Sequence, residues 1–413
     1  MDLTQRRAIE ALRAGVPNRD AVRHLGTDQR AVEKRFVDDL GQVDAERRGG
    51  RQLSGLLIGG DFGAGKSHLL DWLQYIALEQ NFAVSKVVIS KEAPLSQPHR
   101  IFRTAMHSLR LPKIVGGLEE VALRLRPDSA SYAEMYQRIQ DPQSDFDPLF
   151  QASLLVHERV KDAEIMSKML AFWRGEKLDL AGTRRSLKVL GLPMQLKQRR
   201  IADLALPRFR FAAELLAGVG YSGWVLLLDE LELVAAFSLR ARAQSYATLA
   251  RLLGYAPGEA SPGLYTVAAG TNDLATVLFE DRRDQERIPQ RLADRLPELM
   301  PAAQTGMDLL RPSSSARMDL VHQDESALLR TYDKIRDLYE TAYDWMPPDS
   351  RPDLGERSVR MRQYVRRWIT HWDLMRLDPE YRPDIEMRDY RPNLEEQPDL
   401  ERPAEPARDD EDF

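Results

Sequence analysis

The stretch Gly60-Asp61-Phe62-Gly63-Ala64-Gly65-Lys66-Ser67 decides the fold of this 413-residue chain. It satisfies the pattern G-x-x-x-x-G-K-[ST], in which glycines let backbone N–H groups turn inward around phosphate groups. The pattern has this meaning only between a strand and a helix. An apolar run at residues 53–58 precedes the loop, and an amphipathic segment at residues 66–80 follows it. We therefore expect an α/β fold of the P-loop NTPase type, with a parallel sheet flanked by helices.

Each position of this loop has an expected contact with a nucleotide. Lys66 is expected to reach the β- and γ-phosphates, and Ser67 to hold Mg²⁺. The helix that begins at Lys66 adds the partial positive charge of its N-terminus. A guanine-reading Asn-Lys-x-Asp motif is absent from the sequence, so the predicted cofactors are ATP and Mg²⁺. The predicted cofactor-binding residues are Gly60, Asp61, Phe62, Gly63, Ala64, Gly65, Lys66, Ser67 and His68.

Polar residues follow two further apolar strands, at residues 224–228 and 264–269. The first strand ends in Asp229, expected to hold Mg²⁺ through water, and Glu230, expected to polarise the attacking water as general base. The second is followed by Thr271 and Asn272. P-loop ATPases with an additional strand have one more strand between the strand that precedes the glycine-rich loop and the strand that ends in the acidic pair. A polar residue at the end of this additional strand senses the γ-phosphate. Asn272, or alternatively Thr271, fits that role.

Phosphoryl transfer also needs positive charge on the transferring group, which arginine typically supplies. Arg287, Arg291 and Arg295 follow the second strand along the edge of a predicted helix. Arg291 and Arg287 are the candidates for a finger that reaches a neighbouring subunit's site, and such a finger implies a homo-oligomer. Simple solvation of a helix surface is the alternative interpretation.

The rest of the chain divides into helical segments around this core. Residues 1–48 are predicted to be an N-terminal helical region, and residues 115–220 a helical insertion. The core is predicted in two parts, at residues 49–114, with a strand at 83–90, and at residues 221–315, with a last short strand at 307–310. A helical lid or accessory domain is expected at residues 316–376, and an acidic, proline-rich tail at residues 377–413.

Composition excludes several classes of protein. There is no cysteine, hence no disulfide or thiolate metal site. No apolar stretch approaches the ~20 residues of a membrane span, and the N-terminus lacks the pattern of a signal peptide, so a cytoplasmic location is expected. Fourteen acidic residues against five arginines give the tail a net charge of −9; because the whole chain carries −5, the remainder carries +4. That balance is too weak to predict nucleic-acid binding.

The order of these elements resembles an AAA+ ATPase of the origin-recognition and loader type. A closer resemblance is to the BREX phage-defence ATP-binding family. It is carried by RRAIEALRAGVPN at residues 6–18, GGDFGAGKSH at 59–68 and RQYVRRWI at 362–369, with Trp372-Asp373-Leu374 beyond. The compact length is similar to the BrxD-type member rather than the longer BrxC or PglY type. By analogy with AAA+ lids, Arg362, and more weakly Arg360, is assigned as an arginine that contacts the γ-phosphate in cis.

This resemblance implies a role in a bacterial antiviral system that also contains a methyltransferase, an alkaline-phosphatase-like protein and helicase-like partners. The chain would act there as an ATP-driven switch or loader on a complex that contacts DNA directly or through partners. Two alternatives stay open. One is an interaction module that binds ATP, hydrolyses it poorly and docks a partner through the acidic tail; Glu230 argues against it. The other is a regulator whose N-terminal helices read DNA around the turn at residues 26–27; the nearly balanced charges there favour a helical bundle packed on the ATPase core.

Overall fold

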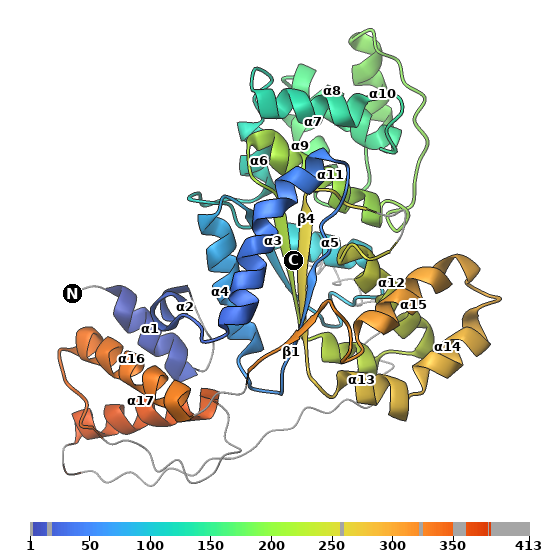
Figure 1. Cartoon of the computed structure of the whole chain (residues 1–413). Helices are drawn as coiled ribbons and strands as arrows, with labels where there is room; N and C mark the ends of the chain where they lie inside the picture. The colour runs from blue at the N-terminus through green and yellow to red at the C-terminus, as the bar shows by residue number, and fades with distance from the viewer. Residues whose placement is uncertain are drawn as a thin grey trace, which may run out of the picture.

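A five-stranded sheet lies at the centre of the molecule (Figure 1). The computed structural model describes residues 3–14, 19–256, 260–321, 325–349, 361–378 and 380. All strand pairs are parallel, in the order β2-β3-β4-β1-β5, which confirms the predicted mixed α/β class and the parallel sheet. The strands are β1 (Leu56–Gly59), β2 (Ala83–Val88), β3 (Trp224–Asp229), β4 (Leu264–Gly270) and β5 (Arg317–Asp319).

The strand order places β4 between β1 and β3. Ile58 of β1 pairs with Ala269 of β4, and Leu226 of β3 pairs with Thr266 of the same strand. Every residue of β3 and β4 is buried, which explains why both strands are mostly apolar and do not alternate between apolar and polar residues. Because parallel strands end at the same edge, the residues that follow β1, β3 and β4 come together there.

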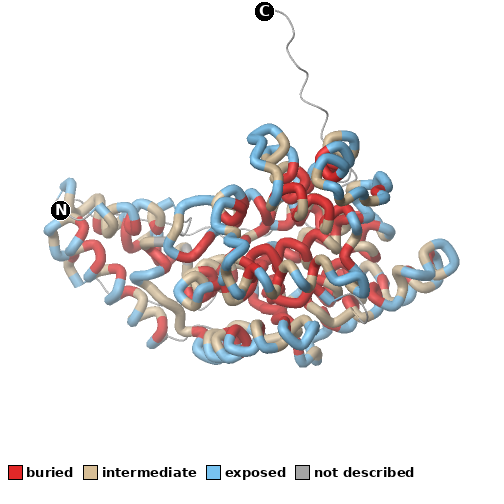
Figure 2. The backbone as a smooth tube through the Cα atoms, turned by 90° about the horizontal axis from the view of Figure 1, so that it is seen from above, coloured by how far each residue is buried: buried red, intermediate tan, exposed pale blue. Residues whose placement is uncertain are grey.

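Helices cover both faces of the sheet, and burial is concentrated in this centre (Figure 2). On one face lie α3 (Arg30–Arg48) and α4 (Lys66–Glu79), packed on Val225, Leu227 and Tyr265. Tyr265 donates a hydrogen bond to Asp39 Oδ2 of α3 (2.6 Å), which fastens α3 to β4. The other face packs on α5 (Pro98–His107), α11 (Ala205–Val219) and α12 (Leu239–Leu252).

The segment predicted as a helical insertion consists of helices joined by loops, and most of it lies at the top of Figure 1. Several of its helices begin at a side-chain cap: Asp147 accepts a hydrogen bond from the backbone N–H of Leu149, and Asp162 from that of Ile165. The helices of this segment before α11 are α6 (Leu118–Arg124), α7 (Ala130–Gln140), α8 (Pro148–Arg159), α9 (Ala163–Trp173) and α10 (Leu180–Val189).

The prediction of a last short strand at residues 307–310 is wrong. These residues belong mostly to α15 (Met300–Leu309), which follows α13 (Leu274–Thr276) and α14 (Asp284–Leu292), and the last strand is instead β5. The buried residues Ala302, Ala303, Gly306 and Met307 recur at helical spacing. A short apolar run does not by itself distinguish a buried helix from a strand, whereas β5 has three residues, two of them charged.

The two ends of the described chain form one helical unit, at the lower left of Figure 1. It contains α1 (Leu3–Ala14), α2 (Arg19–Leu25), α16 (Glu325–Tyr343) and α17 (Met361–Leu377), which share one hydrophobic cluster. Arg13 of α1 donates two hydrogen bonds to Asp373 of α17 (2.7 and 2.8 Å). We call this unit the terminal bundle. Of the three N-terminal helices only α3 packs on the sheet; α1 and α2 pack with α16 and α17.

Within the described ranges, no helix combines the length and apolar character that a membrane crossing requires. The tail predicted at residues 377–413 lies outside the described residues, apart from 377, 378 and 380.

Candidate functional site

The glycine-rich loop, residues 60–67, leaves β1 and enters α4, which begins at Lys66. Gly63 and Gly65 have φ values of 82° and 96°, a left-handed conformation that strains any residue with a Cβ atom. The backbone N–H of Gly60 donates to Gly270 O at the end of β4 (3.2 Å). Lys66 Nζ is folded into the loop, where it donates to the carbonyl oxygens of Gly60 (2.8 Å) and Asp61 (3.1 Å).

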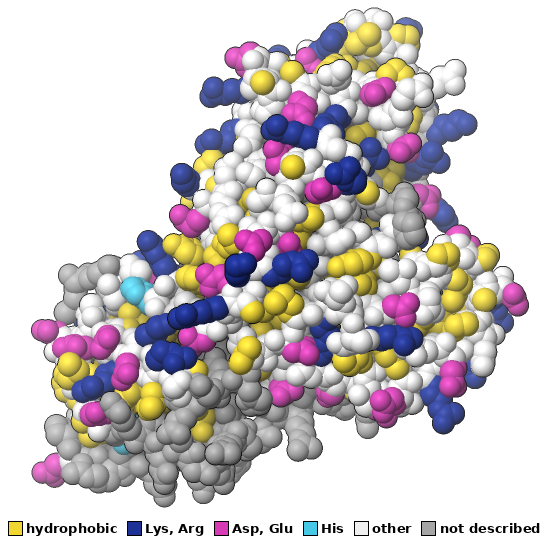
Figure 3. Space-filling view, in the orientation of Figure 1, with side chains coloured by type: hydrophobic (Ala, Val, Ile, Leu, Met, Phe, Trp, Pro, Cys, Tyr) yellow, Lys and Arg dark blue, Asp and Glu magenta, His cyan; other side chains and the backbone are white. Residues whose placement is uncertain are grey.

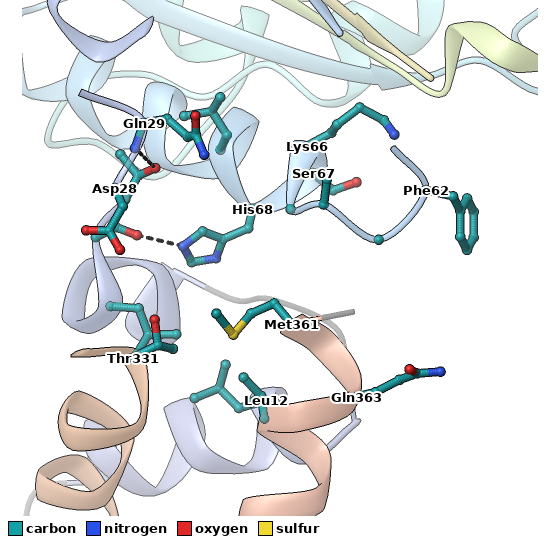
Figure 4. Close-up of a pocket in the computed structure, with 18 of the residues that line it drawn as sticks. Leu12, Asp28, Gln29, Phe62, Lys66, Ser67, His68, Thr331, Met361 and Gln363 are labelled. Carbon is teal, nitrogen blue, oxygen red and sulfur yellow. Dashed lines mark hydrogen bonds between the residues drawn. The ribbon is translucent and has the colours of Figure 1, made fainter. Parts of the chain in front are cut away.

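A cavity of about 490 Å³ separates this loop from the terminal bundle (Figure 4). Four parts of the chain line it: the loop and the start of α4, the connection between α2 and α3, the residues after β3, and the bundle. The lining residues are Leu12, Leu25, Gly26, Thr27, Asp28, Gln29, Phe62, Gly63, Ala64, Gly65, Lys66, Ser67, His68, Leu69, Asp229, Glu230, Glu232, Thr331, Lys334, Met361, Gln363, Val365 and Arg366. Of this set, the sequence analysis predicted the loop residues, His68, Asp229 and Glu230, but not Glu232, the residues between α2 and α3 or the bundle members.

The connection between α2 and α3, residues 26–29, joins the two walls of the cavity. His68 of α4 makes a hydrogen bond to Gly26 O (2.8 Å), as Figure 4 shows. Burial lowers the pKa of His68. The side-chain amide of Gln29 donates to Val321 O (3.0 Å) and accepts from Val321 N (2.9 Å). The connection is therefore held both to the loop helix and to the segment that leads into α16.

Asp229 and Glu230 follow β3 at the edge of the cavity. Asp229 is 3% exposed, and its Oδ1 accepts a hydrogen bond from the backbone N–H of Glu230 (3.0 Å). Glu230 is exposed and has a φ of 62°. A left-handed backbone outside glycine is uncommon and tends to occur at functional sites.

Lys86 of β2 is a site residue that the sequence analysis did not identify. Its ammonium pairs with Asp71 of α4 (2.7 Å), lies 3.7 Å from Asp229 Oδ2 and donates to Ser67 O (3.4 Å). One cation thus contacts both residues predicted to hold Mg²⁺. The sequence feature that could have identified Lys86 is its position as a lone lysine in a strand that is otherwise largely apolar.

The arrangement fits a magnesium–nucleotide complex. Mg²⁺ prefers oxygen ligands and usually takes one or two from protein, with phosphate and water completing its shell. Ser67 and Asp229 supply such oxygens at adjoining positions. Among the described residues, no group of three or more His, Cys, Asp or Glu could hold a metal ion by itself.

Glu232 is a second residue that the sequence analysis missed. It is 5% exposed and lines the cavity two residues beyond Glu230. Burial raises the pKa of Glu232; Lys66 lowers it, and the carboxylates of Glu230 and Asp229 raise it further. Burial also lowers the pKa of Lys66, against the opposing effects of Glu232 and Asp229. The signal in the sequence was an acidic residue spaced by one position from the predicted pair.

Asn272 adjoins the loop without lining the cavity. Its side-chain amide donates to Asp61 Oδ1 (3.0 Å) and accepts from Arg317 Nη2 of β5 (2.9 Å). The alternative, Thr271, is buried, and its hydroxyl has no hydrogen-bond partner among the described residues.

The predicted arginines are distributed differently. Arg287 and Arg291 lie on α14 and Arg295 just beyond it, and these three do not line the cavity. Arg360 and the side chain of Arg362 lie outside the described residues. From the same helix α17, the structure brings Gln363 and Arg366 to the cavity. Arg366 lies one helical turn after Arg362 and was not identified in the sequence analysis.

A model of the family described as "BREX system ATP-binding protein BrxC/D" matches residues 2–123 and 132–384. The match includes the glycine-rich loop, the acidic residues after β3 and all four helices of the terminal bundle, and it confirms the resemblance found in the sequence. No curated protein matches the chain. With most of its length matched, the chain belongs to the BrxC/D family of BREX system ATP-binding proteins, which gives it an ATP-binding role in BREX defence.

Proposed function

We propose that this protein is a Mg²⁺-dependent, AAA+-like ATPase that works as a nucleotide-driven switch or loader in BREX defence. The observation that carries the proposal is the position of the cavity. One wall combines the glycine-rich loop with the acidic residues after β3, and the other is the terminal bundle. A ligand held there contacts two structural units, so its state can control how they are arranged.

The cavity has the size and polarity that a nucleotide needs. Its volume of about 490 Å³ lies within the range of roughly 300–1,000 Å³ for small-molecule sites. The polar end is the loop and the N-terminus of α4, which favour phosphate. The apolar contribution comes from Leu12, Leu25 and Val365, beside which we place the adenine ring.

The catalytic roles follow from this orientation. Lys66 would exchange its two loop carbonyls for the β- and γ-phosphates, since a charged phosphate oxygen is the stronger acceptor. Ser67 and Asp229 would hold Mg²⁺, which would neutralise charge on the phosphates. Glu230 is proposed to orient and deprotonate the attacking water. Asn272, which already bonds to Asp61 of the loop, is proposed as the γ-phosphate sensor.

The switch itself requires contacts that differ between nucleotide states. On the bundle side, Gln363, Arg366 and Lys334 line the cavity. Lys334 donates to Leu25 O (2.5 Å), and Arg330 lies 3.7 Å from Asp28, so the bundle also holds the connection between α2 and α3. We propose that phosphate charge draws Arg366 and Lys334 towards the loop when ATP binds and releases them after hydrolysis. The contact with the γ-phosphate in cis, which was assigned to Arg362 by analogy, is proposed to form in the same ATP-bound state.

The proposal also includes assembly with other copies of this chain and association with DNA. Arg287 and Arg291 are proposed to act on the site of a neighbouring copy, because they lie on α14 and away from the cavity of their own chain. On the face drawn in Figure 3, the described Lys and Arg side chains are interspersed with Asp and Glu. This mixture supports association with DNA through other defence proteins more than through a basic face.

The test is the steady-state ATPase rate of the wild type, Lys66→Ala and Glu230→Gln, with and without duplex DNA, together with light scattering in ATP. Lys188→Ala and Glu298→Gln, which change exposed residues, serve as matched controls. We expect turnover in the wild type and both controls, its loss in the two site variants, and an ATP-dependent oligomer trapped by Glu230→Gln. ATP binding by a wild type with no turnover above Glu230→Gln would refute the ATPase proposal and favour the interaction module.

A further inference from the structure

Glu232 presents a buried oxygen atom with no hydrogen-bond partner at the wall of the cavity. The residue lies in a 3-10 turn, Leu231–Ala236, that directly follows β3. Within the described part of the chain, no donor reaches its Oε2. A buried carboxylate oxygen without a donor is costly, and most buried polar atoms in native proteins have a partner. Its presence here therefore calls for an explanation.

Glu232 lies close to the end of β4 as well as to the end of β3. Its Oε2 lies 3.8 Å from the point that a Cβ atom on Gly270 would occupy, at the end of β4. Gly270 O in turn accepts the hydrogen bond from Gly60 N of the loop. The carboxylate thus lies near the ends of both β3 and β4, where β4 is hydrogen-bonded to the glycine-rich loop. Lys66 is its main opposite charge, but the ammonium donates to two loop carbonyls.

We propose that Glu232 is a second catalytic carboxylate, whose free oxygen accepts a hydrogen bond from the water that attacks the γ-phosphate. This inference rests on the proposed ATPase function. The water oxygen forms a bond to the γ-phosphorus while the bond to the bridging oxygen breaks, and that electron pair stays on ADP. One water proton goes to Glu230. The other O–H of the water points to Glu232, which fixes the direction of attack and takes no proton.

This role predicts an unusual combination of stability and activity. If Glu232 served only packing, an apolar replacement would leave kcat unchanged and would not raise stability. A carboxylate kept for catalysis should differ on both counts: Glu232→Met removes a desolvated charge from the wall, so the nucleotide-free protein should melt at a higher temperature. The same change removes a fixed acceptor from the transition state, so kcat should fall about a hundredfold.

Thr266→Val provides a matched control. Thr266 is fully buried in β4, its hydroxyl also lacks a partner among the described residues, and it does not line the cavity. This variant should gain stability and keep the wild-type kcat. Glu232→Gln is a second test that leaves the shape of the side chain unchanged, and we expect about a tenfold loss of kcat because an amide oxygen is a weaker acceptor than a carboxylate.

The experiment measures ATPase kcat and KM with the melting temperature of the full chain, for the wild type and these three variants. A lower kcat in both Glu232 variants, an ATP KM within about threefold of wild type and a higher melting temperature in Glu232→Met would support the proposal. Wild-type kcat in Glu232→Gln and Glu232→Met would overturn it while the ATPase function stands. Absence of turnover in the wild type would overturn both proposals.

Discussion

Replacing Asp284 by Asn should strongly destabilise the fold. Asp284 begins α14, and its two carboxylate oxygens accept hydrogen bonds from Arg242 Nε (2.7 Å) and Nη2 (2.8 Å) of α12. Both side chains are 0% exposed. Tyr246, one turn along α12, donates to the same carboxylate (2.7 Å). Asp284→Asn removes the negative charge and leaves a desolvated guanidinium in the core.

The magnitude follows from this burial. Removing one partner of a fully buried, hydrogen-bonded ion pair costs about 3–5 kcal/mol, because the remaining charge is neither paired nor hydrated. The loss should be much smaller in the double variant Arg242→Met/Asp284→Leu, which removes both charges. An exposed pair on α3, Lys34 and Asp38, supplies the contrast: its side chains are 80% and 55% exposed, so Asp38→Asn should cost under about 1 kcal/mol.

The assay is urea unfolding of each variant, followed by tryptophan fluorescence, with the free energy of unfolding compared at one temperature and salt concentration. The single variants Arg242→Met and Asp284→Leu, measured together with the double variant, form a cycle that isolates the coupling between Arg242 and Asp284. A loss in Asp284→Asn no larger than that in Asp38→Asn would refute the reasoning. So would a double variant whose loss equals the sum of the single losses.

Three further outcomes are expected. In Gly306→Ala the new Cβ would lie 2.0 Å from Tyr246 O, so α12 and α15 must move apart, and thermal unfolding should show a loss of about 1–3 kcal/mol; an unchanged melting temperature would contradict this. Burial lowers the pKa of His157 to about 4, below its unfolded value of about 6.5. The free energy of unfolding should therefore keep its full value above pH 6.5 and fall by up to about 3 kcal/mol as the pH drops to 4, because the unfolded chain binds the proton more tightly. Urea unfolding as a function of pH should show a shallower decline in His157→Leu, and an identical profile in the two proteins would contradict this prediction. Lys86→Met removes the cation 3.7 Å from Asp229 that opposes Mg²⁺, so half-maximal ATPase activity should need about threefold less Mg²⁺; a higher requirement would show that Lys86 instead orients the site.

The sheet could be predicted because its strands leave strong local signals. β3 and β4 are covered on both faces and are apolar along most of their length, and the glycine-rich loop marks where β1 ends. β5 could not be found in this way, because Arg317-Met318-Asp319 is a three-residue edge strand with too little apolar surface to recognise. Residues 307–310 gave the opposite error, since an apolar face buried against α12 looks the same in sequence as a short strand.

The site could be predicted only where a motif fixes the chemistry. Lys66, Ser67, Asp229 and Glu230 all line one cavity. The bundle wall could not be predicted, because an apolar helix face indicates that a surface is buried and not which partner covers it. For the same reason Arg366 was overlooked: its closeness to the loop is set by how α17 packs against α1.

The terminal bundle gives the chain a particular order of assembly during synthesis. Arg13 and its partner Asp373 are separated by 360 residues, which a ribosome adds in roughly 20–70 s at about 5–20 residues per second. During that interval α16 and α17 are not yet available to cover the apolar faces of α1 and α2. The sheet, whose strands lie between α2 and α16 in the sequence, can already fold. The cavity gains its second wall last. A chain that stops before α17 therefore lacks Gln363, Val365 and Arg366 and has an incomplete cavity wall.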